Sequence, residues 1–162
     1  MRKHGLIVLA VLAILFSASC SSEYRDDLSP MQLCEEILGN LDLKEEFESY
    51  SPRETEYIFE NVETAYEGSL LYSKDSDDLR EIGIFKCNSK KERASLVSAL
   101  EAYIRQLKEE KRSFVVNYLP NEIKTLEGAT VKEYGNYVLF SMLPPENQAS
   151  FLSAAENILK LS

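Results

Sequence analysis

Histidine, cysteine and tryptophan are scarce in this chain of 162 residues. It contains one histidine, His4, three cysteines and no tryptophan. Because His4 lies in an N-terminal segment that we expect to be removed, the mature chain would have no imidazole. The absence of imidazole excludes a Ser-His-Asp triad, a Cys-His nucleophile pair and every zinc or iron site that needs a histidine ligand. Many enzyme mechanisms are therefore excluded before any fold is considered.

The apolar run near the start of the chain is too short to span a membrane. It covers the 11 residues from Leu6 to Phe16 and follows the positive stretch Arg2-Lys3-His4, whereas a membrane-spanning helix needs about 20 residues. Small residues, Ser17-Ala18-Ser19, follow the run in place of a positive stop-transfer cluster. This pattern is typical of a secretory signal peptide, and we predict one over residues 1–19.

The small residues directly before Cys20 resemble the bacterial lipobox, in which the cysteine becomes the lipidated first residue of the mature protein. One position departs from it, because Ser17 stands where leucine is usual. The alternative is ordinary cleavage near Ala18, which leaves Cys20 as a plain thiol. Each buried methylene of an acyl chain such as palmitate contributes about 0.8 kcal/mol, so several chains make a durable anchor. We predict lipidation at Cys20, a short tether over residues 20–28 and a single domain over 29–162, at the extracytoplasmic face of the cell membrane.

Processing makes an acidic chain more acidic. The precursor has 18 basic and 27 acidic residues and a net charge of -9. Removing 19 of the 162 residues leaves 143, and the loss of Arg2 and Lys3 leaves 16 basic residues against 27 acidic ones, a net charge of -11. Nucleic acids and anionic membranes repel such a chain. We therefore exclude nucleic acid as a partner, expect the lipid to hold the chain at the membrane, and expect a protein or another component of the bacterial cell envelope as partner.

Cys34 and Cys87 remain in the mature chain besides Cys20. Outside the cytoplasm a disulfide between them is chemically permitted. Both also fall on apolar faces of their predicted elements, where a free cysteine packs as a small hydrophobic residue. The sequence leaves these two alternatives open. Their wide separation gives no spacing typical of metal ligands, and we predict no metal and no cofactor.

Apolar residues at helical spacing and capping motifs predict the helices. Ser29-Pro30-Met31-Gln32 and Ser89-Lys90-Lys91-Glu92 are capping boxes, in which the serine and the Gln or Glu three residues later satisfy free backbone N–H groups. The second box starts a long helix whose apolar face includes Phe114 and Tyr118. The predicted helical segments are residues 30–38, a turn or two within 43–50, a short piece capped by Ser51-Pro52-Arg53-Glu54, the long helix from Ser89 to the stop at Pro120, 121–127 and 146–161.

Alternating apolar residues predict four strands, over residues 62–73, 79–87, 129–134 and 137–143. Gly135 and Asn136 both tolerate positive φ, so the last two strands form a hairpin. An offset of 55 residues aligns Phe85 with Phe140 and gives six identities over 21 positions, which suggests two strand–strand–helix units. The predicted fold is α+β: short N-terminal helices, then ββα twice, with a four-stranded antiparallel sheet packed against two long helices.

Strand alternation assigns the central residues to two apolar faces of the sheet. One face, which we expect the two long helices to cover, contains Phe85, Cys87, Phe140 and Met142. The other face, a possible ligand-binding surface, contains Ile82, Ile84, Tyr137 and Leu139. It must be covered by the N-terminal helices or left open. We favour the covered alternative, because the apolar residues between Met31 and Phe59 must be buried somewhere.

Four segments have a recognisable combination of residues: Glu81-Ile82-Gly83-Ile84-Phe85-Lys86 with the following helix to Phe114, Tyr118-Leu119-Pro120-Asn121-Glu122, Gly128-Ala129-Thr130-Val131 and Gly135-Asn136-Tyr137-Val138-Leu139-Phe140. With them the chain resembles a family of bacterial lipoproteins catalogued as domain of unknown function 4358. The resemblance covers residues 43–143. It implies a lipoprotein signal, a short spacer and one domain, in Firmicutes such as clostridia, and it implies no activity and no catalytic residues.

The acidic residues are the remaining candidates for chemistry. Asp75, Asp77, Asp78 and Glu81 place four acids within seven residues, which could attract Ca²⁺, although a solvated hairpin tip explains them as well. We expect no catalytic residues and a non-enzymatic binding or accessory domain near the membrane surface. The alternatives are a histidine-independent envelope hydrolase, which needs two carboxylates about 5 to 10 Å apart, and small-ligand binding on the face that contains Ile84 and Leu139.

Overall fold

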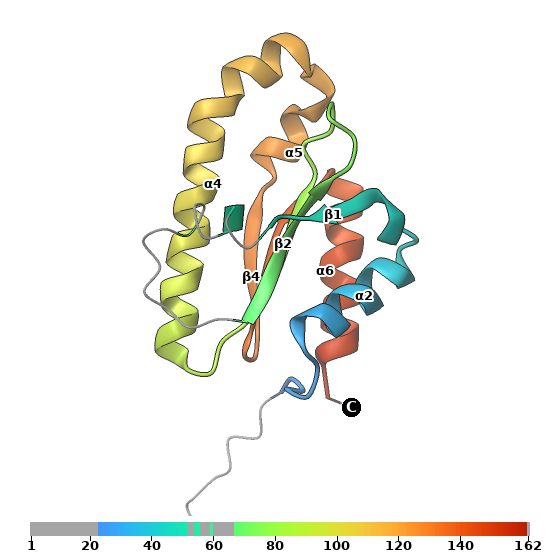
Figure 1. Ribbon diagram of the computed structural model, residues 1–162, viewed down its shortest axis with the longest axis vertical. Helices are drawn as coiled ribbons and strands as arrows, with labels where there is room; N and C mark the ends of the chain where they lie inside the picture. The colour runs from blue at the N-terminus through green and yellow to red at the C-terminus, as the bar shows by residue number, and fades with distance from the viewer. Residues whose placement is uncertain (1–22, 52–53, 56–58, 60–66, 162) are drawn as a thin grey trace, which may run out of the picture.

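The computed structural model describes residues 23–51, 54–55, 59 and 67–161, and its architecture is mixed α+β, as predicted (Figure 1). Five strands form one antiparallel sheet in the order β1-β2-β3-β5-β4. Strands β1 to β5 are Phe47–Ser49, Glu67–Ser73, Glu81–Lys86, Thr130–Tyr134 and Tyr137–Met142. The helices are α2 (Pro30–Asn40), α4 (Lys90–Tyr118), α5 (Ile123–Glu127) and α6 (Pro145–Leu159), with 3-10 turns η1 (Lys44–Glu46) and η2 (Pro120–Glu122).

Local hydrogen bonds place the starts of the main helices as predicted. At α2, Gln32 N donates to Ser29 Oγ (3.2 Å) and Ser29 N donates to Gln32 Oε1 (2.9 Å), which completes the capping box. At α4, Glu92 N donates to Ser89 Oγ (3.2 Å). This helix then runs for 29 residues and ends just before Pro120, where the missing N–H and the proline ring prevent continuation.

The third predicted cap is present at Ser51. Its side chain accepts a hydrogen bond from Glu54 N (3.4 Å), and the Glu54 carboxylate accepts one from Ser51 N (2.9 Å). Of the short helical piece that follows, Glu54 and Thr55 are helical, and most of the rest lies outside the described residues. Residues 62–66, the start of the first predicted strand, lie outside them as well.

The helical turns predicted over residues 43–50 are wrong for the second half of that segment. Lys44–Glu46 form the 3-10 turn η1, but Phe47–Ser49 form the edge strand β1. Phe47 lies opposite Ser73 in β2, and its side chain is buried with 6% exposure. Pairing with the free edge of β2 and burial of an aromatic ring outweigh the weak helical tendency of a short acidic segment. The sheet therefore has five strands where four were predicted.

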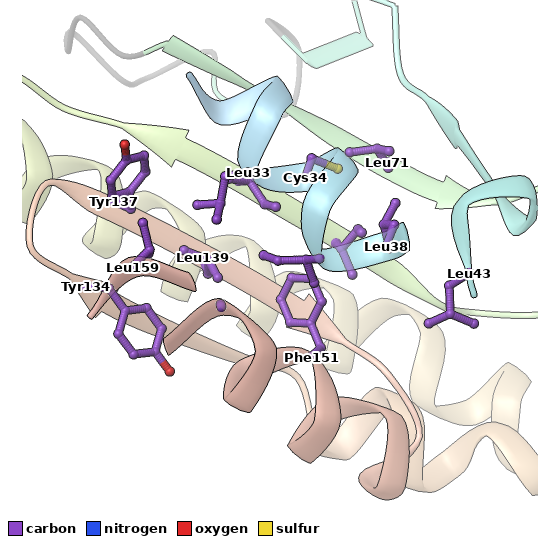
Figure 2. Close-up of a cluster of buried hydrophobic side chains, with 14 of the residues drawn as sticks. Leu33, Cys34, Leu38, Leu43, Leu71, Tyr134, Tyr137, Leu139, Phe151 and Leu159 are labelled. Carbon is purple, nitrogen blue, oxygen red and sulfur yellow. The ribbon is translucent and has the colours of Figure 1, made fainter. Parts of the chain in front are cut away.

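The two long helices lie on opposite faces of the sheet, and not on the same face as predicted. Helix α4, with α5, covers the face that contains Phe85 and Phe140. Helix α6 packs beside α2 on the face that contains Ile84 and Leu139 (Figure 2). The sheet is thus the middle layer between two hydrophobic clusters, which we call the α4 face and the α2–α6 face.

The residues aligned by the 55-residue offset are buried in both units, but the two helices pack on different faces of the sheet. Six aligned helix residues are all buried: Leu96, Leu100 and Ile104 in α4, and Phe151, Ala155 and Leu159 in α6. The first three belong to the cluster on the α4 face and the last three to the cluster on the α2–α6 face. After β3 the chain continues through exposed Asn88, whereas the aligned residue after β5, Leu143, is 1% exposed and packs in the α2–α6 cluster. Burial of Leu143 directs α6 to that face.

The strand register gives the sheet two ends. Lys86 lies opposite Tyr137 at one end, called the Lys86 end, and Glu81 lies opposite Met142 at the other, called the Glu81 end. The N-terminal segment, the C-terminus, the β4–β5 turn and the start of α4 lie at the Lys86 end (Figure 1). The β2–β3 hairpin lies at the Glu81 end, and the second half of α4 passes beyond it (Figure 1).

Candidate functional site

The segment from Glu23 to Leu28, predicted as part of a tether, is bound to the domain. Its backbone runs beside the end of α6, where Arg25 N donates to Leu159 O (2.8 Å) and Leu161 N donates to Glu23 O (3.0 Å). Leu28 is buried, with 7% exposure, in the α2–α6 cluster. From Glu23 onward this segment is therefore part of the folded body.

Lys86, the last residue of β3, holds the segment from the sheet. Its Nζ donates to the backbone oxygens of Asp26 (2.8 Å) and Leu28 (3.2 Å) and lies 3.1 Å from Asp26 Oδ1. It also lies over the ring of Tyr137, 5.4 Å from the centroid. Burial by itself lowers the pKa of Lys86, but the hydrogen bond to Asp26 and the charge of Asp26 raise the pKa above its usual value. All three ammonium donors have a partner.

Tyr137 joins the same segment to the core. Its side chain has 0% exposure, and its hydroxyl donates to Leu28 O at 2.6 Å. Burial raises the pKa of Tyr137, so the hydroxyl stays a neutral donor at physiological pH. Beside it, the ring of Tyr24 packs edge-on against Tyr134, with centroids 5.5 Å apart. Apolar and polar contacts thus hold the segment together.

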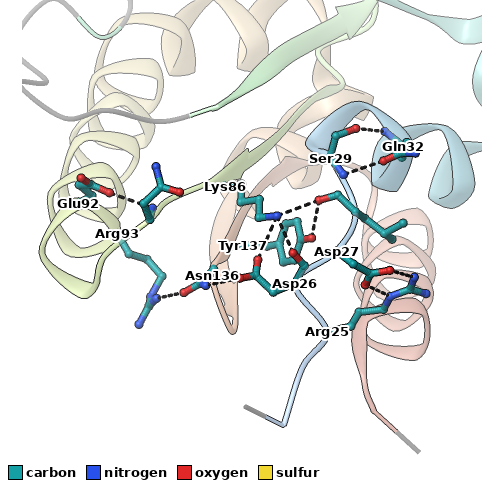
Figure 3. Close-up of polar contacts among 12 residues, drawn as sticks. Arg25, Asp26, Asp27, Ser29, Gln32, Lys86, Glu92, Arg93, Asn136 and Tyr137 are labelled. Atoms are coloured by element: carbon teal, nitrogen blue, oxygen red, sulfur yellow. Dashed lines mark hydrogen bonds and ion pairs between the residues drawn. The ribbon is translucent and has the colours of Figure 1, made fainter. Parts of the chain in front are cut away.

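A chain of polar contacts links the N-terminal segment to two further elements (Figure 3). Asn136 Nδ2 donates to Asp26 Oδ2 (2.9 Å), and Arg93 Nη1 donates to Asn136 Oδ1 (3.1 Å). Arg93 Nε also donates to Glu133 Oε2 (2.8 Å). Gly135, with φ of 59°, gives the β4–β5 turn the left-handed conformation that precedes Asn136. The first turn of α4, the β4–β5 turn and the N-terminal segment are therefore joined.

We call this set of contacts the N-terminal clamp, made by Lys86, Arg93, Asn136 and Tyr137 on residues 26–28. Hydrogen bonds to a charged group contribute about 1.5–3 kcal/mol each when they are shielded from water. The pKa values of Lys86 and Tyr137 are both raised, so neither of these clamp residues is activated as a nucleophile. The clamp determines where the chain leaves the folded body, at the Lys86 end of the sheet. The sequence offered one signal for it, the position of Lys86 and Asn136 at strand ends, but no signal for their partners.

The predicted site residues occupy three different places. Cys20 lies outside the described residues. Cys34 and Cys87 are free, buried thiols in different clusters, Cys34 on the α2–α6 face and Cys87 on the α4 face. Burial, with the nearby charge of Glu35, raises the pKa of Cys34 to about 11, and burial also raises the pKa of Cys87. Of the two alternatives, the structure has packed thiols, and neither is activated as a thiolate.

The possible ligand face is covered, the alternative favoured from the sequence. The four side chains proposed for it have 0% exposure and belong to the cluster packed by α2 and α6: Ile82, Ile84, Tyr137 and Leu139. Figure 2 shows Tyr137 and Leu139 among the side chains of these helices. The covering differs in one respect from the expectation, because the C-terminal helix α6 contributes Phe151 and Leu159 alongside the N-terminal helix. These four side chains are therefore not accessible to a ligand in this arrangement.

Glu81 is not part of a solvated acidic tip. It is buried on the α4 face, with 4% exposure, and its carboxylate accepts the hydroxyl of Tyr103 at 2.9 and 3.1 Å. Burial raises the pKa of Glu81 to about 7, and the hydrogen bond from Tyr103 opposes that shift. Strand alternation could have found this position, because Glu81 shares its face with Gly83 and Phe85.

The other three acids stay on the β2–β3 hairpin. Asp78 accepts hydrogen bonds from Ser73 Oγ (2.8 Å) and Arg80 N (2.8 Å), and Asp75 accepts one from Asp77 N (3.0 Å). These bonds are the local turn contacts that aspartates usually make. Within the part of the chain that the structure describes, no group of three or more His, Cys, Asp or Glu side chains is placed to hold a metal ion.

The end of α4 exposes aromatic residues that the sequence pattern assigned to a buried face. Phe114 is 55% exposed and Tyr118 is 72% exposed, with ring centroids 5.1 Å apart, and Val116 is 50% exposed. The assignment of Phe114 and Tyr118 to a covered face is wrong because α4 extends past the sheet there (Figure 1). Only Val115 is buried in this turn.

The fold and the clamp define a class of protein: an α+β domain with a sheet covered on both faces, which binds its own N-terminal segment at one end. The chain belongs to the family described as Domain of unknown function (DUF4358), whose model matches residues 40–143. The match includes the sheet, α4 and α5, whereas α2, α6 and residues 23–28 lie largely outside it. Neither the comparison with curated proteins nor that with solved structures gives a match. Among the helices of the described residues, none combines the length and apolar character needed to cross a bilayer.

Proposed function

We propose that this chain is a lipid-anchored lipoprotein of the extracytoplasmic membrane face, and that its domain is a non-enzymatic binding module that acts close to the membrane surface. The N-terminal clamp is the observation that carries the proposal. It holds residues 26–28 at one end of the body, and backbone bonds to the end of α6 hold Glu23 and Arg25, directly after the segment that has the signal-peptide pattern and Cys20.

Chain geometry supports a position close to the membrane. Three Cα–Cα steps separate Cys20 from Glu23, and each step across a trans peptide is 3.8 Å, so the two Cα atoms are at most about 11 Å apart. The tether of residues 20–28 predicted from the sequence would have allowed roughly 28 Å beyond the anchor. A lipid on Cys20 therefore leaves the domain little freedom to move away from the bilayer.

The exposed residues on α4 support binding as the activity. Phe114 and Tyr118 form an aromatic pair near the end of α4, whose second half lies beyond the Glu81 end of the sheet and so away from the clamp (Figure 1). Exposed aromatic side chains are enriched where proteins bind partners. By contrast, the buried carboxyl of Glu81 is bonded to Tyr103 beneath α4, and we therefore do not propose a hydrolase.

Replacement of the anchor residue tests the proposal. In the Cys20→Ala variant the processed domain should move from the membrane to the soluble extracytoplasmic fraction, and labelled palmitate should no longer be incorporated. Cys34→Ala is the matched control, because that thiol is buried in the core, and it should leave the fractionation unchanged. Retention of the Cys20→Ala variant in membranes would contradict the anchor.

Capture of partners tests the binding activity. The anchored chain, isolated from detergent-solubilised membranes, should retain one defined envelope protein or component that a lipid-anchored control domain does not retain. The Phe114→Ser/Tyr118→Ser variant should lose it. Equal capture by the control domain would remove the basis for a binding function.

A further inference from the structure

The anchor and the clamp together restrict which end of the domain can reach the bilayer, an argument that rests on the proposed lipid at Cys20. Glu23 enters the folded body at the Lys86 end (Figure 1). The five residue steps from Glu81 to Lys86 in β3 separate the two ends by about 17 Å at 3.4 Å per residue. Because the Cα atom of Cys20 lies within about 11 Å of that of Glu23, the chain is too short to turn the Glu81 end toward the membrane.

Two lysines without an ion-pair partner among the described residues lie at the Lys86 end and can face an anionic surface. Most acidic side chains near the clamp are already paired with basic ones: Asp26 with Lys86, Asp27 with Arg25, and Glu133 with Arg93. Lys90 and Lys91 are exposed in the first turn of α4, and neither forms an ion pair with another described residue. Lys160, 52% exposed, lies at the same end, with contacts to Glu23 and Glu156 of 3.6 and 3.9 Å.

Lys90 and Lys91 lie at the end of α4 where positive charge is electrostatically unfavourable. The N-terminus of a helix has a partial positive charge, so cations in the first turn are unfavourable for folding. Lys90 and Lys91 occupy the first two positions of α4. Residues that break such a local rule often serve a function, and an anionic surface opposite them would offset the repulsion.

The acidic residues of the β2–β3 hairpin have the opposite placement. Asp75 and Asp77 are exposed at the Glu81 end, away from the clamp. An anionic bilayer repels them and attracts the lysines, so both contributions favour one orientation. The net charge of -11 in the predicted mature chain repels an anionic surface as a whole, so contact with the headgroups depends on the lipid anchor and on the few lysines that lie nearest to it.

We propose that the Lys86 end of the domain lies against the anionic lipid headgroups of the membrane that anchors it, with Lys90, Lys91 and Lys160 directed at the headgroups. The second half of α4, with Phe114 and Tyr118, then points away from the bilayer. The partner at the Lys86 end is the lipid surface itself, and a protein partner would bind at the opposite end.

A fluorophore at each end of the domain tests the orientation. The full lipidated chain carries a label at Ala94→Cys, near the start of α4, or at Ser76→Cys, on the β2–β3 hairpin; both residues are small, neutral and exposed. Cys34 and Cys87, 7% and 1% exposed, should react slowly by comparison. The chain is reconstituted in vesicles of phosphatidylcholine and phosphatidylglycerol, about 7:3, that contain a headgroup quencher. The label at position 94 should lose its fluorescence and the label at position 76 should keep it.

Charge reversal tests the role of the lysines. Each lysine near an anionic surface changes the preference for that surface about fivefold, so Lys90→Glu/Lys91→Glu should weaken the quenching at position 94. Vesicles of phosphatidylcholine alone should weaken it as well. Arg105→Glu/Lys124→Glu is the matched control, because it makes the same change in charge at two exposed positions toward the Glu81 end, and it should leave the quenching unchanged.

Each other outcome has a distinct meaning. Equal quenching of both labels, or stronger quenching at position 76, would overturn the orientation while leaving the anchor in place. Quenching of neither label would mean that the chain is not held at the bilayer, which overturns the anchor and the orientation with it. Quenching at position 94 that is insensitive to lipid charge and to lysine reversal would overturn the headgroup contact.

Discussion

Lys86 and Glu81, at opposite ends of β3 and on opposite faces of the sheet, have different surroundings: Lys86 is partly exposed and Glu81 is buried. On the α2–α6 face, Lys86 has a partner for each of its three donors, including the Asp26 carboxylate. On the α4 face, Glu81 is bonded to the neutral hydroxyl of Tyr103. The partners of Lys86 outweigh the effect of burial and raise its pKa, whereas burial raises the pKa of Glu81 to about 7. The compensated residue belongs to a structural clamp, and the uncompensated one makes stability depend on pH.

The largest effect should come from the core of the α2–α6 face, whose helices lie largely outside the matched family region. Phe151→Ala removes a fully buried ring from α6 and should lower the free energy of unfolding by about 3–5 kcal/mol, measured by urea denaturation. Leu152→Ala, the partly exposed neighbour, should cost about 1 kcal/mol. Equal losses would show that α6 does not pack as described.

The next effect concerns Glu81 and the α4 face. The pKa of Glu81 is about 7 in the folded chain against an ordinary value of 4.5, so between these pH values the folded state binds more protons than the unfolded state. The contribution of Glu81 to the free energy of unfolding should therefore be most favourable below about pH 4.5. It should fall by about 3 kcal/mol as the pH rises to about 7.5. Glu81→Gln should lack this loss and be the more stable chain at pH 8. A parallel pH dependence of both chains in urea denaturation would contradict this.

A smaller effect is expected at the clamp. Lys86→Met keeps the length and apolar contacts of the side chain but removes its three donors, so it should cost about 2 kcal/mol. The amides of Arg25 and Leu161 should then exchange hydrogen faster, because their bonds depend on the bound segment. Lys90→Met, an exposed change at the same end, should leave exchange and stability within about 0.5 kcal/mol. If both variants behave alike, Lys86 does not hold the segment.

The smallest effect on stability is expected outside both faces. Phe114→Ser/Tyr118→Ser changes two exposed side chains beyond the end of the sheet and should alter the free energy of unfolding by no more than about 0.5 kcal/mol. The melting temperature of this double variant, measured beside the capture experiment, separates lost binding from lost folding. A large drop in melting temperature would place these rings in the core after all.

Sequence patterns predicted the features that depend on close neighbours. The cap of α2 joins Ser29 to Gln32, three residues apart, and the β4–β5 turn needs only the φ of Gly135. The stop of α4 before Pro120 depends on one ring. Each is decided within one turn of backbone, where sequence and conformation are directly connected.

The same patterns failed where a choice depended on distant residues. The apolar stripe of α6 was recognised, but the face that it covers depends on Leu143 and on α2, more than a hundred residues earlier. Phe114 and Tyr118 continue the helical period of α4, yet the sheet is too short to cover them. For the clamp, Lys86 and Asn136 gave no indication that Asp26 would be their partner.

Periodicity and capping were thus sufficient for the α+β class and for most helix and strand bounds. They are local properties, read from residues that lie within a few positions of one another. The opposite placement of the two long helices, the fifth strand, the burial of Glu81 and the clamp on the N-terminal segment arise only when remote segments compete for the same apolar surface and the same hydrogen-bond donors. That competition is a property of the folded chain, and it places the exit of the N-terminal segment at the Lys86 end.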